Sequence, residues 1–343
     1  MIAIVHPAHQ RAAQRRKGDR AVEICLHLGA HRTGTTSFQC HVQRHRGTLS
    51  HGGTAVWTPK QTRAGLFDGL VHRPDRVTAE IARRSERSRV AIRREVGRLT
   101  EAGYDRLMIT EENLLGSARN NLRDGALYSD VLERLLRFRA ALAAPVARIA
   151  ISLRSYDSYW ASVLAYAVMN GHSMPQTDLI CRLASQSRTW GDVIRDVARV
   201  FPQTDIVVFP FEAMVSHPDA ELSHLIGQRV SLSEADDWRN PSPRLRKLRE
   251  ELVNRGDLDG AIRLGQGSGA WMPFDADQRA AMQRTYADDL TELRDGAIAQ
   301  ARLIEIPTQY GLDTTHSRQT EVTNAYWRSA IGGPDHGRQR YLV

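Results

Sequence analysis

The segment 26–37, LHLGAHRTGTTS, combines glycine, hydroxyl and basic residues in an order that suits phosphate binding. An apolar, β-prone run at 21–28 precedes it, and a run typical of a helix, 37–46, follows it. Gly29 and Gly34 allow the backbone between them to curl, and free N–H groups at a helix N-terminus attract an anion. This strand–loop–helix pattern predicts binding of a phosphorylated nucleotide.

The side chains of this loop narrow the choice of nucleotide. Its glycines have the spacing of an NTPase P-loop, G-x-x-x-x-G-K-[ST], in which a lysine follows the second glycine and contacts the phosphates. Thr35 occupies that lysine position, whereas the positive charge lies at Arg32, two residues before Gly34. The loop therefore predicts a phosphate site that differs from the ordinary triphosphate loop. Further hydroxyl donors to an anion are expected from Thr33, Thr35, Thr36 and Ser37.

A cation followed by [ST]-G-T-T after a strand resembles the 5′-phosphosulfate loop of the sulfotransferases, usually Lys-[Ser/Thr]-Gly-Thr-Thr. The resemblance implies an enzyme that takes its sulfuryl group from 3′-phosphoadenosine 5′-phosphosulfate (PAPS) and releases adenosine 3′,5′-bisphosphate. It assigns donor binding to the loop from Arg32 to Ser37, with Arg32 in place of the family's lysine. Arginine effectively cannot deprotonate, but it can stabilise a leaving phosphate by charge and hydrogen bonds.

A second strand and helix continue the resemblance. Residues 146–153 (VARIAISL) are apolar and β-branched enough for a buried strand, and Arg154 lies at its end. In sulfotransferases, an arginine at such a strand end and a serine eight positions later hold the donor's 3′-phosphate, which points to Ser162 here. The family's usual Asp-Pro after the arginine is replaced by Ser155-Tyr156. Two separate anion sites suit PAPS, whereas a nucleoside triphosphate would leave the second one unused.

Two adjacent glutamates follow another apolar strand, 106–110 (RLMIT), which runs directly into the sequence EENL. Sulfotransferases that act on glycans carry a glutamate near the end of the equivalent strand, and this resemblance aligns Glu112 best, with Glu111 one position away. The hypothesis is that Glu112 takes the proton from the acceptor, because a neutral alcohol is a poor nucleophile. Alternatively, either glutamate caps the following turn or pairs with an arginine. His31 is a weaker candidate base, and His27 is expected to be packed or bonded to backbone.

The resemblance as a whole implies metal-free, in-line transfer of a sulfuryl group from PAPS to a hydroxyl or amine. Arg32 and the loop amides would neutralise charge on the bridging oxygen. Two other functions remain open. One is a P-loop nucleotide kinase or NTPase, with RLMITEE as a Walker-B-like strand, and the other is a non-catalytic nucleotide-binding homologue. The acceptor is expected to be a small molecule, a glycan or a lipid headgroup, and the sequence does not fix the oligomeric state.

Composition limits the partners and the compartment. The net charge is +8, but lysine occurs only at Lys17, Lys60 and Lys247 among 47 basic residues, which indicates a general arginine bias. No basic stripe interleaved with aromatic residues predicts nucleic-acid binding. The three cysteines show no C-x-x-C spacing, so neither a disulfide framework nor a zinc site is expected. No apolar run is long enough for a membrane span or a signal peptide, and a cytoplasmic, bacterial enzyme is expected.

Alternating strands and helices predict an α/β fold of the three-layer, P-loop-like type, with a central, mostly parallel sheet flanked by helices. We expect a flexible basic arm at 1–20, one sulfotransferase-like α/β domain at 21–305 and a tail at 306–343. The segment 47–75 is expected to be irregular and to line the acceptor cleft. Strands are expected at 21–28, 106–110, 146–153 and 205–209, and helices at 37–46, 76–103, 126–143, 157–169, 190–200, 242–255 and 275–301.

Overall fold

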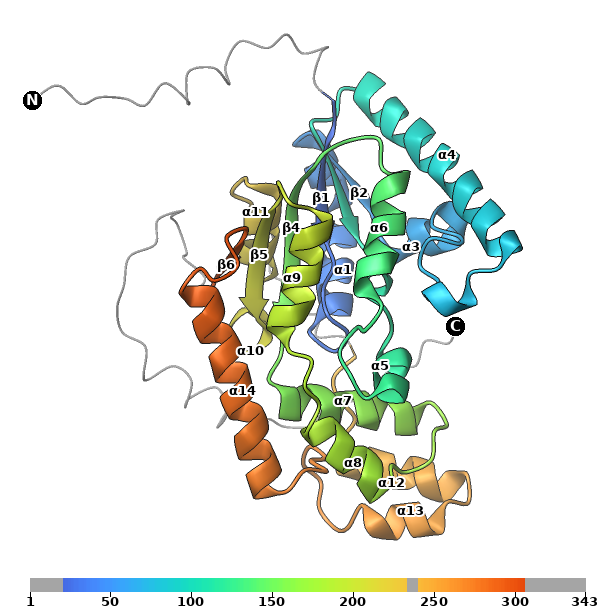
Figure 1. Ribbon diagram of the computed structural model, residues 1–343, viewed down its shortest axis with the longest axis vertical. Coiled ribbons are helices and arrows are strands. Elements are labelled where there is room, and N and C mark those ends of the chain that lie inside the picture. The colour runs from blue at the N-terminus through green and yellow to red at the C-terminus, as the bar shows by residue number, and fades with distance from the viewer. Residues whose placement is uncertain (1–20, 233–239, 306–343) are drawn as a thin grey trace, which may run out of the picture.

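A six-stranded sheet forms the centre of the protein, seen in a computed structural model that describes residues 21–232 and 240–305 (Figure 1). All of its strand pairs are parallel, which confirms the predicted α/β class. The predicted arm and tail lie outside the described residues. The strands, in sheet order, are β2 (Thr54–Trp57), β3 (Arg106–Thr110), β1 (Glu23–His27), β4 (Val146–Leu153), β5 (Asp205–Pro210) and β6 (Ala301–Leu303).

Both faces of the sheet are buried, as the apolar strand sequences require. Successive residues alternate between two hydrophobic clusters, as in β1, where Ile24 and Leu26 belong to the larger cluster and Cys25 to the smaller. Cys25 is buried and fills this side of the sheet core. Burial also raises the pKa of its thiol to about 11, so it stays protonated near neutral pH.

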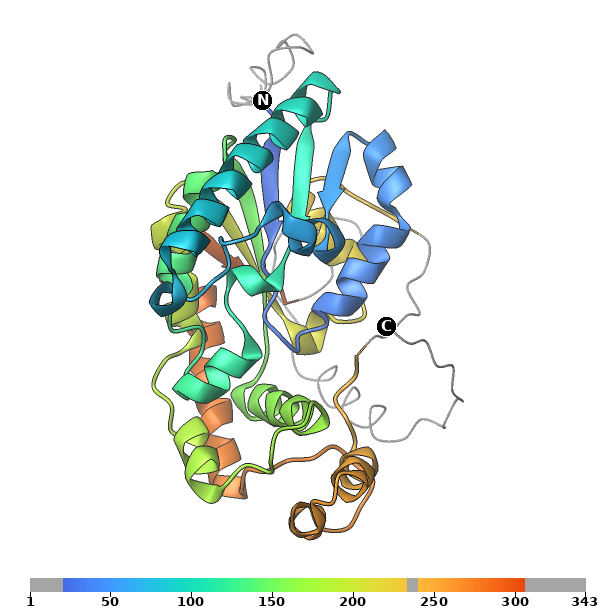
Figure 2. The same cartoon turned by 90° about the vertical axis from the view of Figure 1, so that its right-hand side faces the viewer.

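Helices cover the two faces of the sheet, and further helices lie beyond the carboxyl ends of the strands (Figure 2). The larger cluster lies under α4 (Ala79–Glu101), α6 (Val131–Ala141) and α9 (Trp190–Val200). The smaller lies under α1 (Thr35–Arg44), α2 (Arg46–His51), α10 (Phe211–Met214) and α11 (Pro218–Ile226). Beyond the carboxyl ends of the strands are α5 (Ala118–Asp124), α7 (Tyr156–Met169), α8 (Thr177–Ala184), α12 (Leu245–Asn254) and α13 (Leu258–Arg263), while α14 (Ala276–Arg294) packs beside β6. None of the described helices is apolar over a length that could span a bilayer.

Three expectations about local structure were wrong. The segment 47–75 contains α2, β2, the short helix α3 (Pro59–Gln61) and the π-turn η1 (Thr62–Leu66) instead of irregular chain. The helix expected over 275–301 ends at Arg294, and β6 follows it. Tyr128 lies outside α6 with a left-handed φ of 43°. The two missed strands span three or four residues at the sheet edges, too few to show alternation.

The strand order reverses its direction at the carboxyl end of β1. After β1 the chain builds β2 and β3 on one side of that strand, and it then crosses over to build β4, β5 and β6 on the other. Such a reversal leaves an opening between the loops that follow the two central strands, which is where α/β proteins bind ligands. The segments that follow β1 and β4 are the predicted phosphate loop and the segment that begins at Arg154.

Candidate functional site

The loop between β1 and α1 has the tightly curled backbone that the glycine spacing predicts. Gly29, Arg32 and Gly34 all adopt positive φ, at 42°, 66° and 79°, and α1 begins directly after Gly34. A Cβ atom on Gly29 would lie 2.7 Å from Thr35 Oγ1, so no larger residue fits there. The loop therefore presents the first N–H groups of α1 at the sheet edge, where they can meet an anion.

The loop hydroxyls do not all face outward as expected. The hydroxyls of Thr33 and Thr35 both donate to the carbonyl oxygen of Ala30, at 2.6 and 3.1 Å. Both side chains are buried. These two threonines stabilise the loop conformation, and what they can offer to a ligand is their backbone N–H. Thr36 lies closer to the surface, and its hydroxyl accepts a hydrogen bond from the side chain of Asn240.

The two anion sites predicted from separate strands lie against each other. Nη1 of Arg154 donates to the carbonyl oxygen of Arg32 at 2.8 Å, and Nε of Arg32 donates to Ser162 Oγ at 2.9 Å. Arg154 also donates to the hydroxyl of Ser158 and lies over the ring of Phe211. The structure thus brings together the loop, the end of β4 and the buried second turn of α7.

Neither guanidinium has a carboxylate partner at ion-pair distance within 21–232 and 240–305. Burial lowers the pKa of Arg154 to about 10 and lowers that of Arg32 from its ordinary value, and the two charges repel each other. Glu212 is the acidic neighbour of Arg154, but burial raises its pKa and it accepts bonds from Ser155 N and Tyr286 OH. Two half-buried positive charges with no paired carboxylate in the described part of the chain form a site that favours an anion.

Three residues that sequence reasoning missed complete this site. Ser242 Oγ lies 2.6 Å from Ser162 Oγ, and the carbonyl oxygen of Asn240 accepts from Nη2 of Arg32 at 3.1 Å. The ring of Tyr166 lies under the Arg32 guanidinium, 5.1 Å from centroid to Cζ. Asn240 and Ser242 carry no motif, and their contacts span about 80 residues or more. No local sequence signal could have found them.

The structure separates the two candidate bases after β3. The side chain of Glu111 is buried and accepts from Thr62 Oγ1, from Arg63 and from the backbone N–H of Asn113. It caps the turn η3 (Glu112–Leu114). Glu112 is more exposed, and each of its oxygens has one donor: Arg63 Nη2 and Gln39 Nε2, both at 2.7 Å. Both glutamates therefore pair with an arginine, but only Glu111 also caps the turn, and Glu112 is the more exposed of the two.

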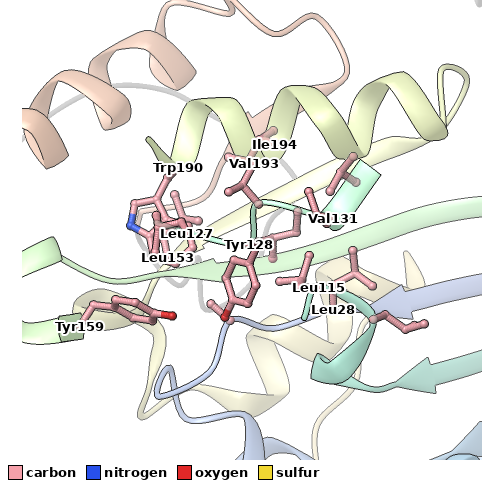
Figure 3. Packing of buried hydrophobic residues seen from close by; sticks show 14 of the residues in the cluster. Leu28, Leu115, Leu127, Tyr128, Val131, Leu153, Tyr159, Trp190, Val193 and Ile194 are labelled. Atoms are coloured by element: carbon pink, nitrogen blue, oxygen red, sulfur yellow. The ribbon is translucent and has the colours of Figure 1, made fainter. Parts of the chain in front are cut away.

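His31 and Glu112 interact electrostatically: the carboxylate favours a higher pKa of the imidazole, and the imidazole favours a lower pKa of the carboxyl group. Burial dominates and lowers the pKa of His31, so the imidazole stays neutral near pH 7. Its backbone N–H and Nδ1 both contact the hydroxyl of Tyr128, at 2.9 and 3.0 Å. Figure 3 shows Tyr128 among the core residues with its hydroxyl toward the loop. Tyr128 thus anchors the loop from the larger cluster.

Comparison with known proteins adds little to this geometry. No family model matches the sequence, and no curated protein matches it. Among solved structures, a sulfotransferase from Alicyclobacillus acidocaldarius aligns with 71% of this chain and 93% of its own, at 17% sequence identity and a TM-score of 0.36.

Proposed function

We propose that the protein is a sulfotransferase that uses PAPS as its donor. The observation that carries the proposal is the meeting of Arg32 and Arg154 at the carboxyl edge of the sheet, without a carboxylate partner among the described residues. One belongs to a curled loop at a helix N-terminus and the other to the end of the neighbouring strand. PAPS carries two anionic groups separated by an adenosine ribose, which matches two adjoining cationic positions on different strands.

The residues present fit such a donor. The loop from Arg32 to Ser37 would hold the 5′-phosphosulfate, because α1 begins directly after Gly34 without a side-chain cap at its N-terminus. Arg154 and Ser162 would hold the 3′-phosphate, since a guanidinium and a hydroxyl are good partners for phosphate oxygens. PAPS, when bound, supplies the sulfuryl group. Arg32 keeps its proton throughout and stabilises negative charge on the phosphate that leaves.

Glu112 accepts the proton of the acceptor hydroxyl or amine in this proposal. Burial, the largest single influence, would raise its pKa, but the charges of Arg63 and His31 and the hydrogen bonds to the carboxylate together hold the pKa below its ordinary value. The carboxylate is therefore ionised near neutral pH and ready to accept a proton. His31 is neutral and lies nearby, and it is the second candidate for this role. The acceptor would be a small molecule, a glycan or a lipid headgroup in the cytoplasm.

Transfer of radiolabelled sulfate from PAPS into extracts of the source organism tests this function. We expect a labelled product with the wild-type protein in EDTA and far less of it with Arg32→Ala or Arg154→Ala. The matched control is Arg87→Ala, because Arg87 is an exposed arginine of α4 remote from the loop. Magnesium-dependent ATP hydrolysis or phosphoryl transfer, with no sulfate transfer, would instead support a P-loop kinase or NTPase. Donor binding without any transfer would support a non-catalytic homologue.

A further inference from the structure

A chain of buried polar side chains runs beneath the loop, from α11 to the end of β3. His27 is 1% exposed and lies at the end of β1, where its Nδ1 is 2.8 Å from Thr110 Oγ1 and its Nε2 is 3.1 Å from Glu221 Oε1. Ser152 donates to the same carboxylate oxygen at 2.9 Å. Burial of so many polar groups is costly unless each one is hydrogen-bonded. The hydrogen bonds among His27, Thr110, Ser152 and Glu221 offset that cost.

The chemistry of the groups fixes the direction of each hydrogen bond. A carboxylate only accepts, so Nε2 of His27 carries the proton that it shares with Glu221. In the tautomer protonated at Nε2 alone, Nδ1 accepts the hydroxyl proton of Thr110. The oxygen of Thr110 is left as an acceptor, and Nε2 of Gln39 donates to it at 3.3 Å. Each step determines the next.

The chain ends on the candidate base. The same Nε2 atom of Gln39 donates its other proton to Oε2 of Glu112 at 2.7 Å. Both neighbours of this amide nitrogen accept, so the amide of Gln39 has only one favourable orientation. Gln39 lies in α1, the helix whose first residues form the phosphate loop. One helix thus connects the anion site to the carboxylate of Glu112.

We propose that His27, Thr110 and Gln39 are positioning residues that transmit a fixed hydrogen-bond direction from the buried carboxylate of Glu221 to Glu112. The role of Glu112 as base rests on the proposed sulfotransferase function, but the coupling of the two carboxylates does not. With Gln39 on one oxygen and Arg63 on the other, the carboxylate is held in one orientation with its remaining lone pairs available to an acceptor.

The titration of Glu112 tests the chain without any substrate. Carbon-13 NMR of the glutamate carboxyl groups, with Glu112→Gln to assign the signal, measures its pKa directly. A hydrogen bond to the ionised carboxylate lowers the pKa, so Gln39→Met is expected to raise it by roughly one unit. Thr110→Val is expected to raise it by roughly half a unit, because Gln39 remains but is no longer oriented. Thr110→Ser keeps the hydroxyl and should restore the wild-type value.

The matched control is Thr204→Val. It removes a buried threonine hydroxyl that donates to Val146 O at the start of β4, at the end of the sheet opposite to the candidate site. This variant should leave the Glu112 titration unchanged. The other ionisable groups that interact with Glu112 are Arg63, His31 and Tyr128, and all three remain in every variant. An unchanged titration in Thr110→Val would overturn the proposed chain.

Sulfate transfer, measured on the same proteins, separates this proposal from the proposed function. In Thr110→Val we expect the acid limb of kcat/KM to shift with the pKa of Glu112, while the affinity for adenosine 3′,5′-bisphosphate stays within about twofold of wild type. A shifted Glu112 titration in Thr110→Val, together with an inactive wild type, would refute the sulfotransferase function and support the proposed chain of hydrogen bonds. An unshifted titration with an active wild type would do the opposite.

Discussion

Arg32 and Arg154 are both linked to the phosphate loop, but they differ in what they could do there. Arg32 belongs to the loop itself, whereas Arg154 donates to its backbone from the end of β4. We expect Arg32→Ala to lower kcat of sulfate transfer about 100-fold or more, because a charge-stabilising donor acts mainly in the transition state. The affinity for adenosine 3′,5′-bisphosphate should fall far less. Steady-state kinetics and calorimetry measure the two effects, and small, equal losses would reduce Arg32 to an ordinary contact.

The neighbouring glutamates should respond differently to the same substitution. Glu112→Gln is expected to lower kcat about 100-fold or more with normal stability, because the amide cannot accept the acceptor's proton. Glu111→Gln should instead lower the free energy of unfolding by about 1–3 kcal/mol, since its buried carboxylate accepts from several donors. Denaturant unfolding and sulfate-transfer assays of both variants test this division. Near-normal turnover in both would remove the proposed base.

The Arg63 guanidinium sets the pH range in which Glu112 can act. Its charge stabilises the ionised carboxylate and helps to hold the pKa of Glu112 below the ordinary range of a glutamate. A base works in its deprotonated form, so kcat/KM should decline on acidification only below that ordinary range. Arg63→Met removes the charge, raises the pKa and should move the acid limb to higher pH. A limb that stays in place in the pH profile of Arg63→Met would show that another group is responsible.

The loop and the start of α1 depend on one glycine more than on any other. Gly29 has a φ of 42°, and a Cβ there would lie 2.7 Å from Thr35 Oγ1 and 2.9 Å from Cε1 of His27. We expect Gly29→Ala to destabilise the protein by about 1–3 kcal/mol. The control is Gly97→Ala in α4, where a Cβ meets nothing within 4 Å and alanine favours the helix. Urea unfolding of both variants measures the difference, and equal midpoints would contradict the strained loop.

Long apolar runs made the central strands predictable from sequence. The bounds predicted for β3 and β4 agree with the structure, and the residues at the ends of β1, β3 and β4 lie at the same edge because the strands are parallel. The edge strands β2 and β6 were missed because three or four residues carry no periodic signal. The contacts of Gln39, Arg63 and Ser242 were equally hidden, since they join elements that are distant in sequence. Residues that belong to a motif could be predicted from the sequence, whereas the residues that contact them could be identified only in the folded structure.

The molecule as a whole is positively charged, and two of its arginines lie together at the candidate site. Its net charge is +8, and Arg32 and Arg154 lie together where the strand order reverses. A positive field of this kind speeds the encounter with an anionic ligand and weakens as salt screens it. An anion bound between the two guanidinium groups would also remove the repulsion between them.

In the proposed function, these two arginines form one site for an adenosine bearing two separated anionic groups. Calorimetric titration with adenosine 3′,5′-bisphosphate in EDTA tests it most directly, with ATP and adenosine 5′-monophosphate as competitors. The prediction is metal-free binding that loses at least about tenfold in affinity in Arg154→Ala, by the strength of a charge-assisted hydrogen bond. Removal of the 3′-phosphate should cost a similar amount. Binding that requires magnesium, prefers ATP and ignores Arg154→Ala would contradict the claim.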